Sequence, residues 1–242
     1  MPLAGLGKVR ESFEYPEEYH AVNTGGTTTL LDALAATATG RRFAFASSAA
    51  VYGVPERQPV TENAPLLPAS PYGESKVAAE QAVEAAAAGG AIEAVSLRIF
   101  NAAGAAAGVA DTDLSRVIPK ALAVAAGQAS RVEVNGDGSA VRDFVHVDDV
   151  ASAFLRALEN EGRLGKAAAY NVGATAASVA EILAVAGEVT GRPIPVVRNP
   201  PRNEPRVLIS DHSKIGAELG WSPARSALRE IVADAWDAVS RA

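Results

Sequence analysis

The stretch that decides the fold class is Arg42–Ser48, with the sequence RFAFASS. A short apolar run with two aromatic residues is typical of a buried strand, and the two serines mark the point where that strand stops. In an open parallel α/β sheet, ligands bind at the carboxyl ends of the strands. We therefore expect the hydroxyl groups of Ser47 and Ser48 to lie at a ligand-binding edge.

A helix with an unusual pair of side chains is expected shortly after this strand. Ser70 and Pro71 have the residue types of an N-cap and a first helical position, and Tyr72 and Lys76 then share one helix face. A phenol with a pKa of about 10 is a poor base at neutral pH, but a nearby ammonium group lowers that pKa. Tyr72 is a candidate general base, although Tyr-x-x-x-Lys alone is more often an amphipathic helix with a solvated lysine.

Composition and charge narrow the class of protein. The chain has 242 residues, of which 48% are hydrophobic and 21% charged, so it can bury a substantial core. A net charge of -6 and a pI near 5.2 argue against nucleic acid as a partner. The absence of cysteine excludes disulfides and thiolate metal sites. No apolar run reaches bilayer length and no signal peptide is recognisable, so we expect a soluble, cytoplasmic protein without membrane contact.

The rest of the chain alternates helical and extended patterns. The helix that starts at Pro71 stops at Gly89 and Gly90, and an apolar strand follows at Val95–Phe100. Strand, helix and strand in this order predict a right-handed parallel crossover. Residues 12–19 are polar, contain proline and are expected to be a connection. Further apolar patterns predict helices at 21–38, 114–127, 150–158, 179–190 and 226–240, and a strand at 132–134.

Several short motifs carry a recognisable pattern, in order along the chain. They are Asn23-x-x-Gly26-Thr27, Ser47-Ser48, Val51-Tyr52-Gly53, Ser70-Pro71-Tyr72-Gly73-x-Ser75-Lys76, Leu97-Arg98-x-Phe100-Asn101, the run Arg142–Ala151, Tyr170–Gly173 and Leu219–Pro223. Together they resemble the extended short-chain dehydrogenase/reductase superfamily. Within it, the chain is similar to the NAD-dependent epimerase/dehydratase family and to its nucleotide-sugar epimerases of the UDP-glucose 4-epimerase type.

The resemblance implies an α/β fold with two parts. One part is a partial Rossmann-like, doubly wound parallel sheet, expected over residues 1–103 with a contribution from residues 142–175. The other is a smaller substrate-binding lobe, expected over residues 104–141 and 176–242. The family commonly forms dimers, so a homodimer is expected as well.

The resemblance also implies a cofactor, NAD, and an isomerase reaction. Tyr72 would act as a phenolate that takes the proton of a sugar hydroxyl while hydride passes to NAD, and the keto sugar would then be reduced on its other face. Lys76 would hold the nicotinamide ribose and lower the pKa of Tyr72, and Ser48 would hydrogen-bond the reacting oxygen. Asn23 is expected near the nicotinamide, and Ser47 is expected to be a cofactor or backbone contact.

A nucleotide-sugar substrate, in particular a UDP-hexose, follows from the same likeness. Asn101 would contact the sugar nucleotide, Val134 would pack against the base, and Arg142 would bind the diphosphate, with the following aspartate holding it. Arg202 is a candidate for a second diphosphate clamp, although the neighbouring glycine of the family pattern is absent. The chain also has Ser115-Arg116 where some relatives carry paired asparagines, which leaves the sugar and the base open.

Two other kinds of site are disfavoured by the residues themselves. Sugar-nucleotide dehydratases of the family place an acidic pair directly after the catalytic hydroxyl, and related decarboxylases usually keep one acid there, whereas this chain has Ala49 and Ala50. His146 with Asp148 and Asp149 suggests a metal site, but either aspartate reads better as the N-cap of the helix at 150–158. His146 is then a structural hydrogen-bonding residue, and no metal is expected.

One feature of the family pattern is absent from the chain. No Gly-x-Gly-x-x-Gly follows a strand, and the acidic residue for the adenosine ribose is missing with it. We therefore expect the first βα units of the Rossmann domain to precede this sequence, which predicts an open sheet edge, either from a truncated reading of a longer gene or in a short protein that pairs with a partner or itself. Two alternatives to an epimerase stay open: a pseudoenzyme that binds a nucleotide sugar or a partner without turnover, and a net NAD(P)-dependent dehydrogenase or reductase.

Overall fold

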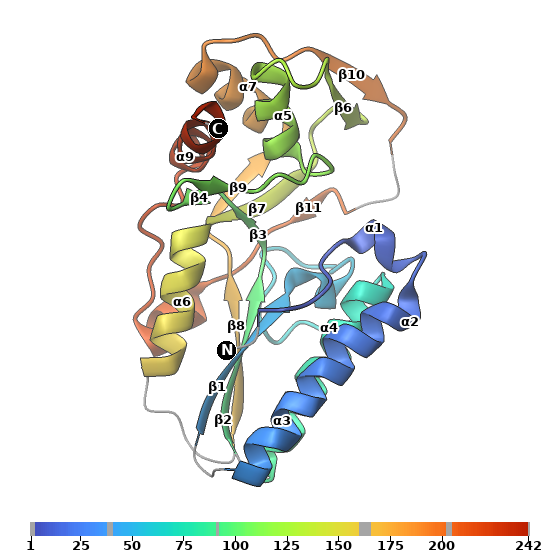
Figure 1. Ribbon diagram of the computed structural model, residues 1–242, viewed down its shortest axis with the longest axis vertical. Coiled ribbons are helices and arrows are strands. Elements are labelled where there is room, and N and C mark those ends of the chain that lie inside the picture. Colours follow the sequence, from blue (N-terminus) through green and yellow to red (C-terminus); the bar gives the residue numbers. More distant parts are fainter. Residues whose placement is uncertain (1–2, 38–40, 91, 160–165, 202–204, 242) are drawn as a thin grey trace. The chain divides into compact units, whose positions relative to one another are not determined.

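A computed structural model describes residues 3–37, 41–90, 92–159, 166–201 and 205–241 (Figure 1). The chain folds into two compact units, and each unit is assembled from three separate stretches of sequence. Unit 1 consists of residues 1–99, 153–172 and 211–221, and unit 2 consists of residues 100–152, 173–210 and 222–242.

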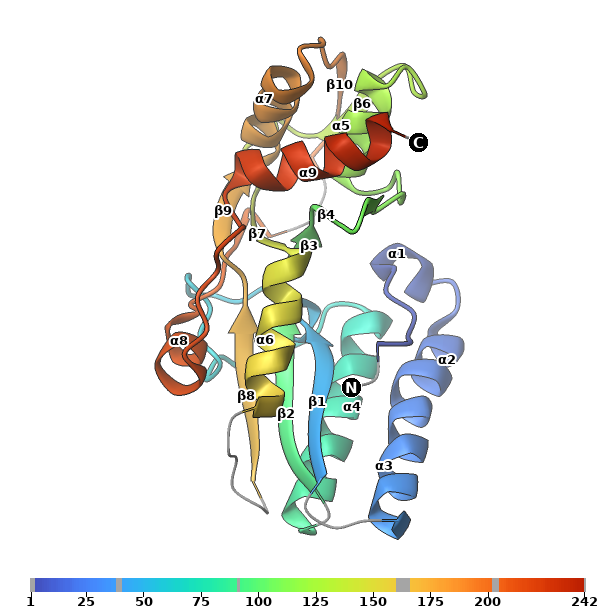
Figure 2. The same ribbon diagram turned by 60° about the vertical axis from the view of Figure 1, so that its left-hand side comes forward.

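Unit 1 is built on a parallel sheet of β1 (Arg41–Ser48), β2 (Ile92–Ile99) and β8 (Ala167–Val172), in the order β1-β2-β8 (Figures 1 and 2). The register sets Ser48 opposite Ile99, and Ile99 opposite Val172, so the three strands end at one edge. Among the described residues β1 pairs with β2 alone, which makes it an edge strand.

The helices of unit 1 pack against this sheet or against one another. They are α1 (Val9–Ser12), α2 (Pro16–Tyr19), a π-helix (His20–Gly25), α3 (Gly26–Thr37), a 3₁₀ turn (Ala49–Tyr52), α4 (Pro71–Ala88) and α8 (Ser213–Leu219). Leu31 of α3 and Val83 of α4 pack against Phe43, Phe45 and Ile92 of the strands. The long helix α4 therefore lies directly on the strand that carries the two serines.

Unit 2 contains a mixed sheet in the order β11-β7-β3, with β9 antiparallel to β7, and a separate parallel pair, β10 and β6. Its strands are β3 (Asn101–Ala103), β4 (Ala105–Ala106), β5 (Val109–Ala110), β6 (Val132–Asn135), β7 (Val141–His146), β9 (Thr175–Ser178), β10 (Val196–Asn199) and β11 (Val207–Leu208). The helices α5 (Val117–Ala125), α7 (Val179–Thr190) and α9 (Leu228–Ser240) supply its apolar core, whereas α6 (Val147–Glu159) runs on from β7 and passes into unit 1 after Ser152.

Most expected elements are present with small shifts of their ends. The strands at 42–46 and 95–100, the helix between them and the parallel crossover are confirmed, and α7 has the expected bounds. The connection expected at 12–19 is wrong, because α2 begins with Pro16 at its first position and two glutamates in its first turn, and it buries Tyr19. No described helix is both long and apolar enough to cross a membrane.

The N-cap expected at Asp148 or Asp149 is also wrong. Helix α6 begins at Val147, so both aspartates lie inside its first turn, where negative charge is favoured by the helix dipole. Their carboxylates bind other segments of unit 2, as described below.

Candidate functional site

The helix that carries Tyr72 and Lys76 is positioned from its first residue. Ser70 caps it, because its hydroxyl accepts a hydrogen bond of 3.1 Å from the Gly73 amide, and Pro71 takes the first helical position. A Cβ on Gly73 would lie 2.6 Å from the Ala50 carbonyl oxygen, a distance that no real side chain tolerates. Glycine after Tyr72 is therefore required for α4 to sit this close to the turn that follows Ser48.

Lys76 places a cation under the ring of Tyr72. Its Nζ donates a hydrogen bond of 2.9 Å to the Ala46 carbonyl of β1 and lies 6.0 Å from the centroid of the Tyr72 ring. Burial lowers the pKa of Lys76 to about 8, against an opposing contribution from the Glu80 carboxylate. Lys76 is thus mainly protonated at neutral pH and loses its charge just above it.

Tyr72 is supported by a second tyrosine. The ring of Tyr19 meets that of Tyr72 edge to face, with 6.2 Å between the centroids. Tyr19 is itself fixed, since its hydroxyl donates to the Lys8 carbonyl at 2.8 Å and accepts from the Lys8 amide at 3.1 Å, and only 1% of the residue is exposed. The packing restricts the orientation of the Tyr72 ring, and the residue as a whole stays partly exposed.

The two serines at the end of β1 have different surroundings. The hydroxyl of Ser47 is buried and donates a very short hydrogen bond to the carboxylate of Glu80 on α4. The hydroxyl of Ser48 accepts a hydrogen bond of 3.2 Å from the Ala50 amide and caps the 3₁₀ turn. Ser47 therefore faces α4, whereas the hydroxyl of Ser48 lies against the start of the 3₁₀ turn that follows the strand. The expected contact of Ser47 with a cofactor stays a prediction.

Asn23 fastens the start of the chain to α4. Its side-chain amide nitrogen donates to the Ser75 hydroxyl and to the Leu6 carbonyl, both at 3.0 Å, and its oxygen accepts from the Leu6 amide at 2.9 Å. A Cβ on Gly5 would lie 2.9 Å from that oxygen. Unit 1 thus brings Asn23, Ser48, Tyr72 and Lys76 onto neighbouring segments, and the contact of Asn23 with a nicotinamide stays a prediction.

The residues expected to bind substrate lie in unit 2. Asn101 donates a hydrogen bond of 2.7 Å to the Asp143 carbonyl, and Arg142 donates one of 3.0 Å to the carbonyl of Val141. Val134 is only 5% exposed and belongs to the apolar core of the unit. Arg202 lies outside the described residues. The substrate roles of these four residues stay predictions.

Asp143 does not have the expected function of holding Arg142. One of its oxygens accepts from the Ala174 amide at 2.7 Å, and the other accepts from the amide and hydroxyl of Ser210 at 2.8 and 2.5 Å. The carboxylate is buried and joins β7 to two segments far away in the sequence. Its hydrogen bonds make it an anchor of unit 2.

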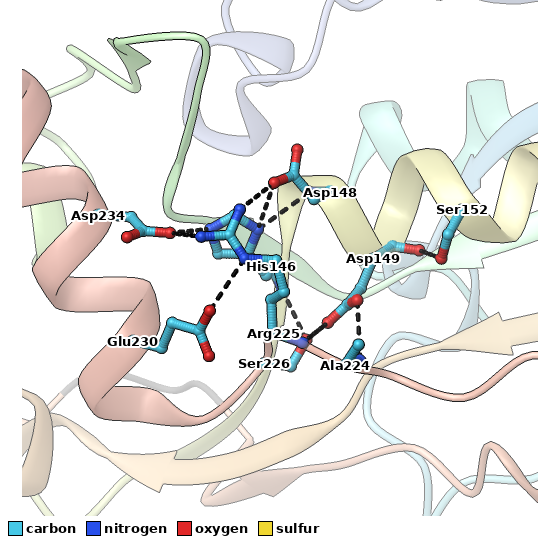
Figure 3. A network of polar contacts seen from close by, with 9 residues as sticks. All are labelled: His146, Asp148, Asp149, Ser152, Ala224, Arg225, Ser226, Glu230 and Asp234. Carbon is cyan, nitrogen blue, oxygen red and sulfur yellow. Dashed lines mark hydrogen bonds and ion pairs between the residues drawn. The ribbon is translucent and has the colours of Figure 1, made fainter.

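His146 lies in a polar network at the junction of β7 and α6 (Figure 3). It is fully buried; its Nδ1 accepts a hydrogen bond of 3.1 Å from the Asp148 amide, and its Nε2 lies 3.1 Å from a carboxylate oxygen of Asp234. Nδ1 as an acceptor leaves the proton of the neutral ring on Nε2, facing that carboxylate. His146 is thus confirmed as a structural hydrogen-bonding residue, and the described residues contain no group of three side chains able to hold a metal.

Asp149 and Arg225 complete the network in Figure 3. Asp149 accepts hydrogen bonds from the Ala224 and Arg225 amides, both at 2.9 Å, and from the Ser226 hydroxyl at 2.5 Å. The guanidinium of Arg225 contacts the carboxylates of Asp148, Glu230 and Asp234. These contacts attach residues 224–226 and the start of α9 to the first turn of α6.

Sequence reasoning missed a buried ion pair next to the candidate site. Glu80 and Arg98 are 1% and 4% exposed, and a hydrogen bond of 2.7 Å joins Nη2 of Arg98 to Oε2 of Glu80. A signal was present in the sequence, since Glu80 lies four residues after Lys76 on the same helix and Arg98 interrupts an apolar strand. The two charges indicate a pair only once α4 is known to pack against β2.

The donor set of unit 1 fits one half of a dinucleotide. An ammonium group has three donors, and the described hydrogen bond to Ala46 uses one of them, so Lys76 is chemically suited to a ribose diol. Tyr72 and Ser48 add hydroxyl groups for a reacting oxygen. The glycine-rich turn that would receive a pyrophosphate does not occur in the 242 residues.

Comparison with known proteins gives one consistent result. Residues 1–173 match the profile of the "NAD dependent epimerase/dehydratase family". The UDP-glucose 4-epimerase of Streptomyces lividans is 39% identical over 248 residues, which cover 97% of this chain and 73% of that protein. Two solved UDP-glucose 4-epimerases are similar in structure: that of Stenotrophomonas maltophila, with bound NAD and formylated UDP-arabinopyranose (TM-score 0.90, 34% identity, 99% of this chain and 76% of that one), and that of Brucella ovis with NAD (TM-score 0.88, 35% identity, 97% and 75%).

Proposed function

This chain belongs to the NAD dependent epimerase/dehydratase family, and we propose that it is a nucleotide-sugar 4-epimerase that acts on a UDP-hexose. One observation supports this activity above all others: the half-buried ammonium of Lys76 lies beneath the Tyr72 ring, next to the strand end that presents Ser48. This arrangement provides a base, a cation that favours its phenolate form, and a hydroxyl for the reacting oxygen.

The residues of the chain divide the work between them. NAD, when bound, supplies the reversible two-electron oxidation of the sugar carbon. Tyr72 takes the proton from the sugar hydroxyl. It returns the proton when the keto sugar is reduced on its other face. Ser48 hydrogen-bonds the same oxygen, and Lys76 holds the nicotinamide ribose and stabilises the Tyr72 phenolate.

The surroundings of Ser48 favour an epimerase over a dehydratase. Elimination of water needs an additional acid and base beside the reacting carbon. The positions after Ser48 are Ala49 and Ala50, which have no proton to donate, and Ala49 is 7% exposed. The reaction is therefore expected to end with the configuration at one carbon changed and no water lost.

The test is epimerisation of UDP-glucose to UDP-galactose by the purified chain with added NAD, followed by anion-exchange chromatography. Tyr72→Phe is expected to lower kcat about 10²- to 10⁴-fold, the range of a lost general base. Tyr15→Phe is the matched control, because Tyr15 is 52% exposed, and it should retain activity.

Other outcomes separate the alternatives. A stoichiometric and lasting change in NADH absorbance would assign a net dehydrogenase or reductase. Binding of UDP-glucose without turnover in the presence of NAD would assign a binding protein, and equal activity of the Tyr72→Phe and unchanged chains would contradict the proposed base.

Three further statements belong to this proposal. We propose that residues 1–103 and 142–175 carry the cofactor half, that residues 104–141 and 176–242 form the substrate lobe, and that the protein works as a homodimer in the cytoplasm. The family membership supports these assignments. Sedimentation equilibrium tests the dimer, and fractionation of the source cells tests the compartment.

A further inference from the structure

A chain of buried polar groups lies behind the Tyr72 helix. Glu80 accepts the hydroxyl of Ser47 and the guanidinium of Arg98, with Nε of Arg98 at 3.1 and 3.2 Å from its two oxygens. Arg98 then donates to the Tyr52 hydroxyl at 3.0 Å, and Tyr52 donates to the Asn171 side chain at 2.6 Å. The chain of contacts links β1, α4, β2, the 3₁₀ turn and β8, all within unit 1.

Such a pair is an expensive way to stabilise a core. Removing two charges from water is strongly unfavourable, and apolar residues of the same size often stabilise a core as well or better. Glu80 and Arg98 are both buried, so water does not solvate the two ions in the folded chain. The location of the pair is therefore the better indication of what it does.

Glu80 touches both catalytic elements. On α4 it lies one helical turn after Lys76, and across to β1 it holds Ser47, whose neighbour in the strand is Ser48. A change in Glu80 would reach the cation and the reacting hydroxyl at the same time. No other described residue contacts Ser47 through a side-chain hydrogen bond.

The charges around Lys76 come from few residues. Tyr72 and Glu80 lie on its own helix, the Ala46 carbonyl and the Phe45 ring face it from β1, and Arg98 on β2 lies behind Glu80. Of the described carboxylates, Glu80 is the one whose charge raises the pKa of Lys76 against the effect of burial.

We propose that Glu80 is a positioning residue of the active site: it holds Ser47 beside Ser48 and places a carboxylate one helical turn from Lys76, while Arg98 balances the charge of that carboxylate. The part of Glu80 in catalysis rests on the proposed function. The effect of Glu80 on Lys76 is independent of that function, because the two residues interact in the chain without cofactor or substrate.

The first experiment measures Lys76 directly. The chain is acylated with a trace of acetic anhydride at a series of pH values, and peptide mass spectrometry follows the modification of Lys76. The unchanged chain should show a midpoint at about pH 8. In Glu80→Gln, the midpoint should fall by about one pH unit, the low end of the shift caused by an opposite charge nearby.

A matched control and a rescue make the result specific. Glu84→Gln changes an exposed glutamate one turn further along the same helix and should leave the midpoint unchanged. Glu80→Asp keeps the charge and should restore most of the shift. A folded Glu80→Gln chain with the midpoint of the unchanged chain would overturn the proposal.

A second substitution tests the case in which the Glu80→Gln chain does not fold. If Glu80→Gln alone does not fold, Arg98→Met is added, so that neither ion is left alone, and the same labelling is performed. If the double variant has an unchanged Lys76 midpoint, or if it also fails to fold, the pair serves stability alone and the proposal fails.

The second experiment connects Glu80 to the reaction. The Lys76 cation is present below its pKa and is lost as the pH rises through it, so Glu80→Gln should move the alkaline limb of kcat to lower pH by the same shift as the labelling midpoint. KM for the UDP-sugar should change less than twofold. An inactive unchanged chain with the expected labelling shift would refute the proposed function while leaving the effect on Lys76 intact.

Discussion

The two polar networks of this protein contain the same residue types but differ in their exposure to water. In unit 1, Arg98 and Glu80 are closed off from solvent, with side chains 5% and 2% exposed. In unit 2, the Arg225 side chain is 39% exposed, as is that of its partner Asp148. The arginine that meets carboxylates therefore lies in a medium of low dielectric constant in one network and close to solvent in the other.

The difference shows that burial decides what an ion pair does. In unit 1 the charge of Glu80 acts on Lys76 with little screening, so the pair influences a proton equilibrium. In unit 2 water screens Arg225, and the contacts better shielded from water are the hydrogen bonds to the buried carboxylate of Asp149. One network adjusts chemistry, and the other joins segments of chain.

Breaking the buried pair gives the largest expected effect. Arg98→Met leaves the Glu80 carboxylate buried without its counter-ion and should lower the free energy of unfolding by about 3–5 kcal/mol in urea denaturation. Arg10→Met, at an exposed position of α1, is the control and should change little. Adding Glu80→Gln to Arg98→Met should recover a large part of the loss, and additive losses in the double variant would contradict a coupled pair.

Removing the buried anchor of unit 2 should have an intermediate effect. Asp149→Ala deletes the acceptor of three hydrogen bonds, one of them buried and two part-buried, and leaves their donors in residues 224–226 without this partner, which should cost about 2–3 kcal/mol. Urea denaturation and amide hydrogen exchange of residues 224–226 measure it. Asp237→Ala, whose side chain is 64% exposed, serves as the control, and equal losses in the two variants would argue against the anchor.

The exposed arginine should matter least. Arg225→Gln is expected to lower the unfolding midpoint by less than Asp149→Ala, because solvent screens the ion pairs it removes. The difference in unfolding midpoint between Arg225→Gln and the unchanged chain should become smaller still in about 1 M salt, where the Debye length is about 3 Å. A large loss that is independent of salt would show that Arg225 acts through packing and not through charge.

Local patterns predicted the frame of unit 1 well. The run around Phe43 and Phe45 predicted β1, and Ser70 with Pro71 predicted the start of α4, because caps and apolar periodicity are properties of neighbouring residues. The same reasoning failed at Asp149. An aspartate before an apolar run satisfies the rule for an N-cap, but the partners of Asp149 are residues 224–226, which no local pattern reveals.

The features of the candidate site were likewise predictable only where they depend on neighbouring residues. The spacing of Tyr72 and Lys76 predicted a shared face, and the geometry agrees. The contacts of Ser47 and Asn23 were not predictable, since they depend on how β1, α4 and residues 5–6 pack. The ion pair of Glu80 and Arg98 could not be predicted from either residue alone, because each is compatible with a solvated surface until α4 is known to pack against β2.

The division of each unit into three stretches has a consequence for the order of folding during synthesis. Unit 1 takes Ile215, Leu219 and Trp221 into its interior, and the core of unit 2 includes Ile231 and Val232 of α9. Domains usually fold in the order in which the ribosome releases them. Unit 1 is complete only once residues 211–221 have left the ribosome, and unit 2 only once α9 has. The serine-bearing strand and the helix packed on it are therefore made well before the unit that contains them is complete.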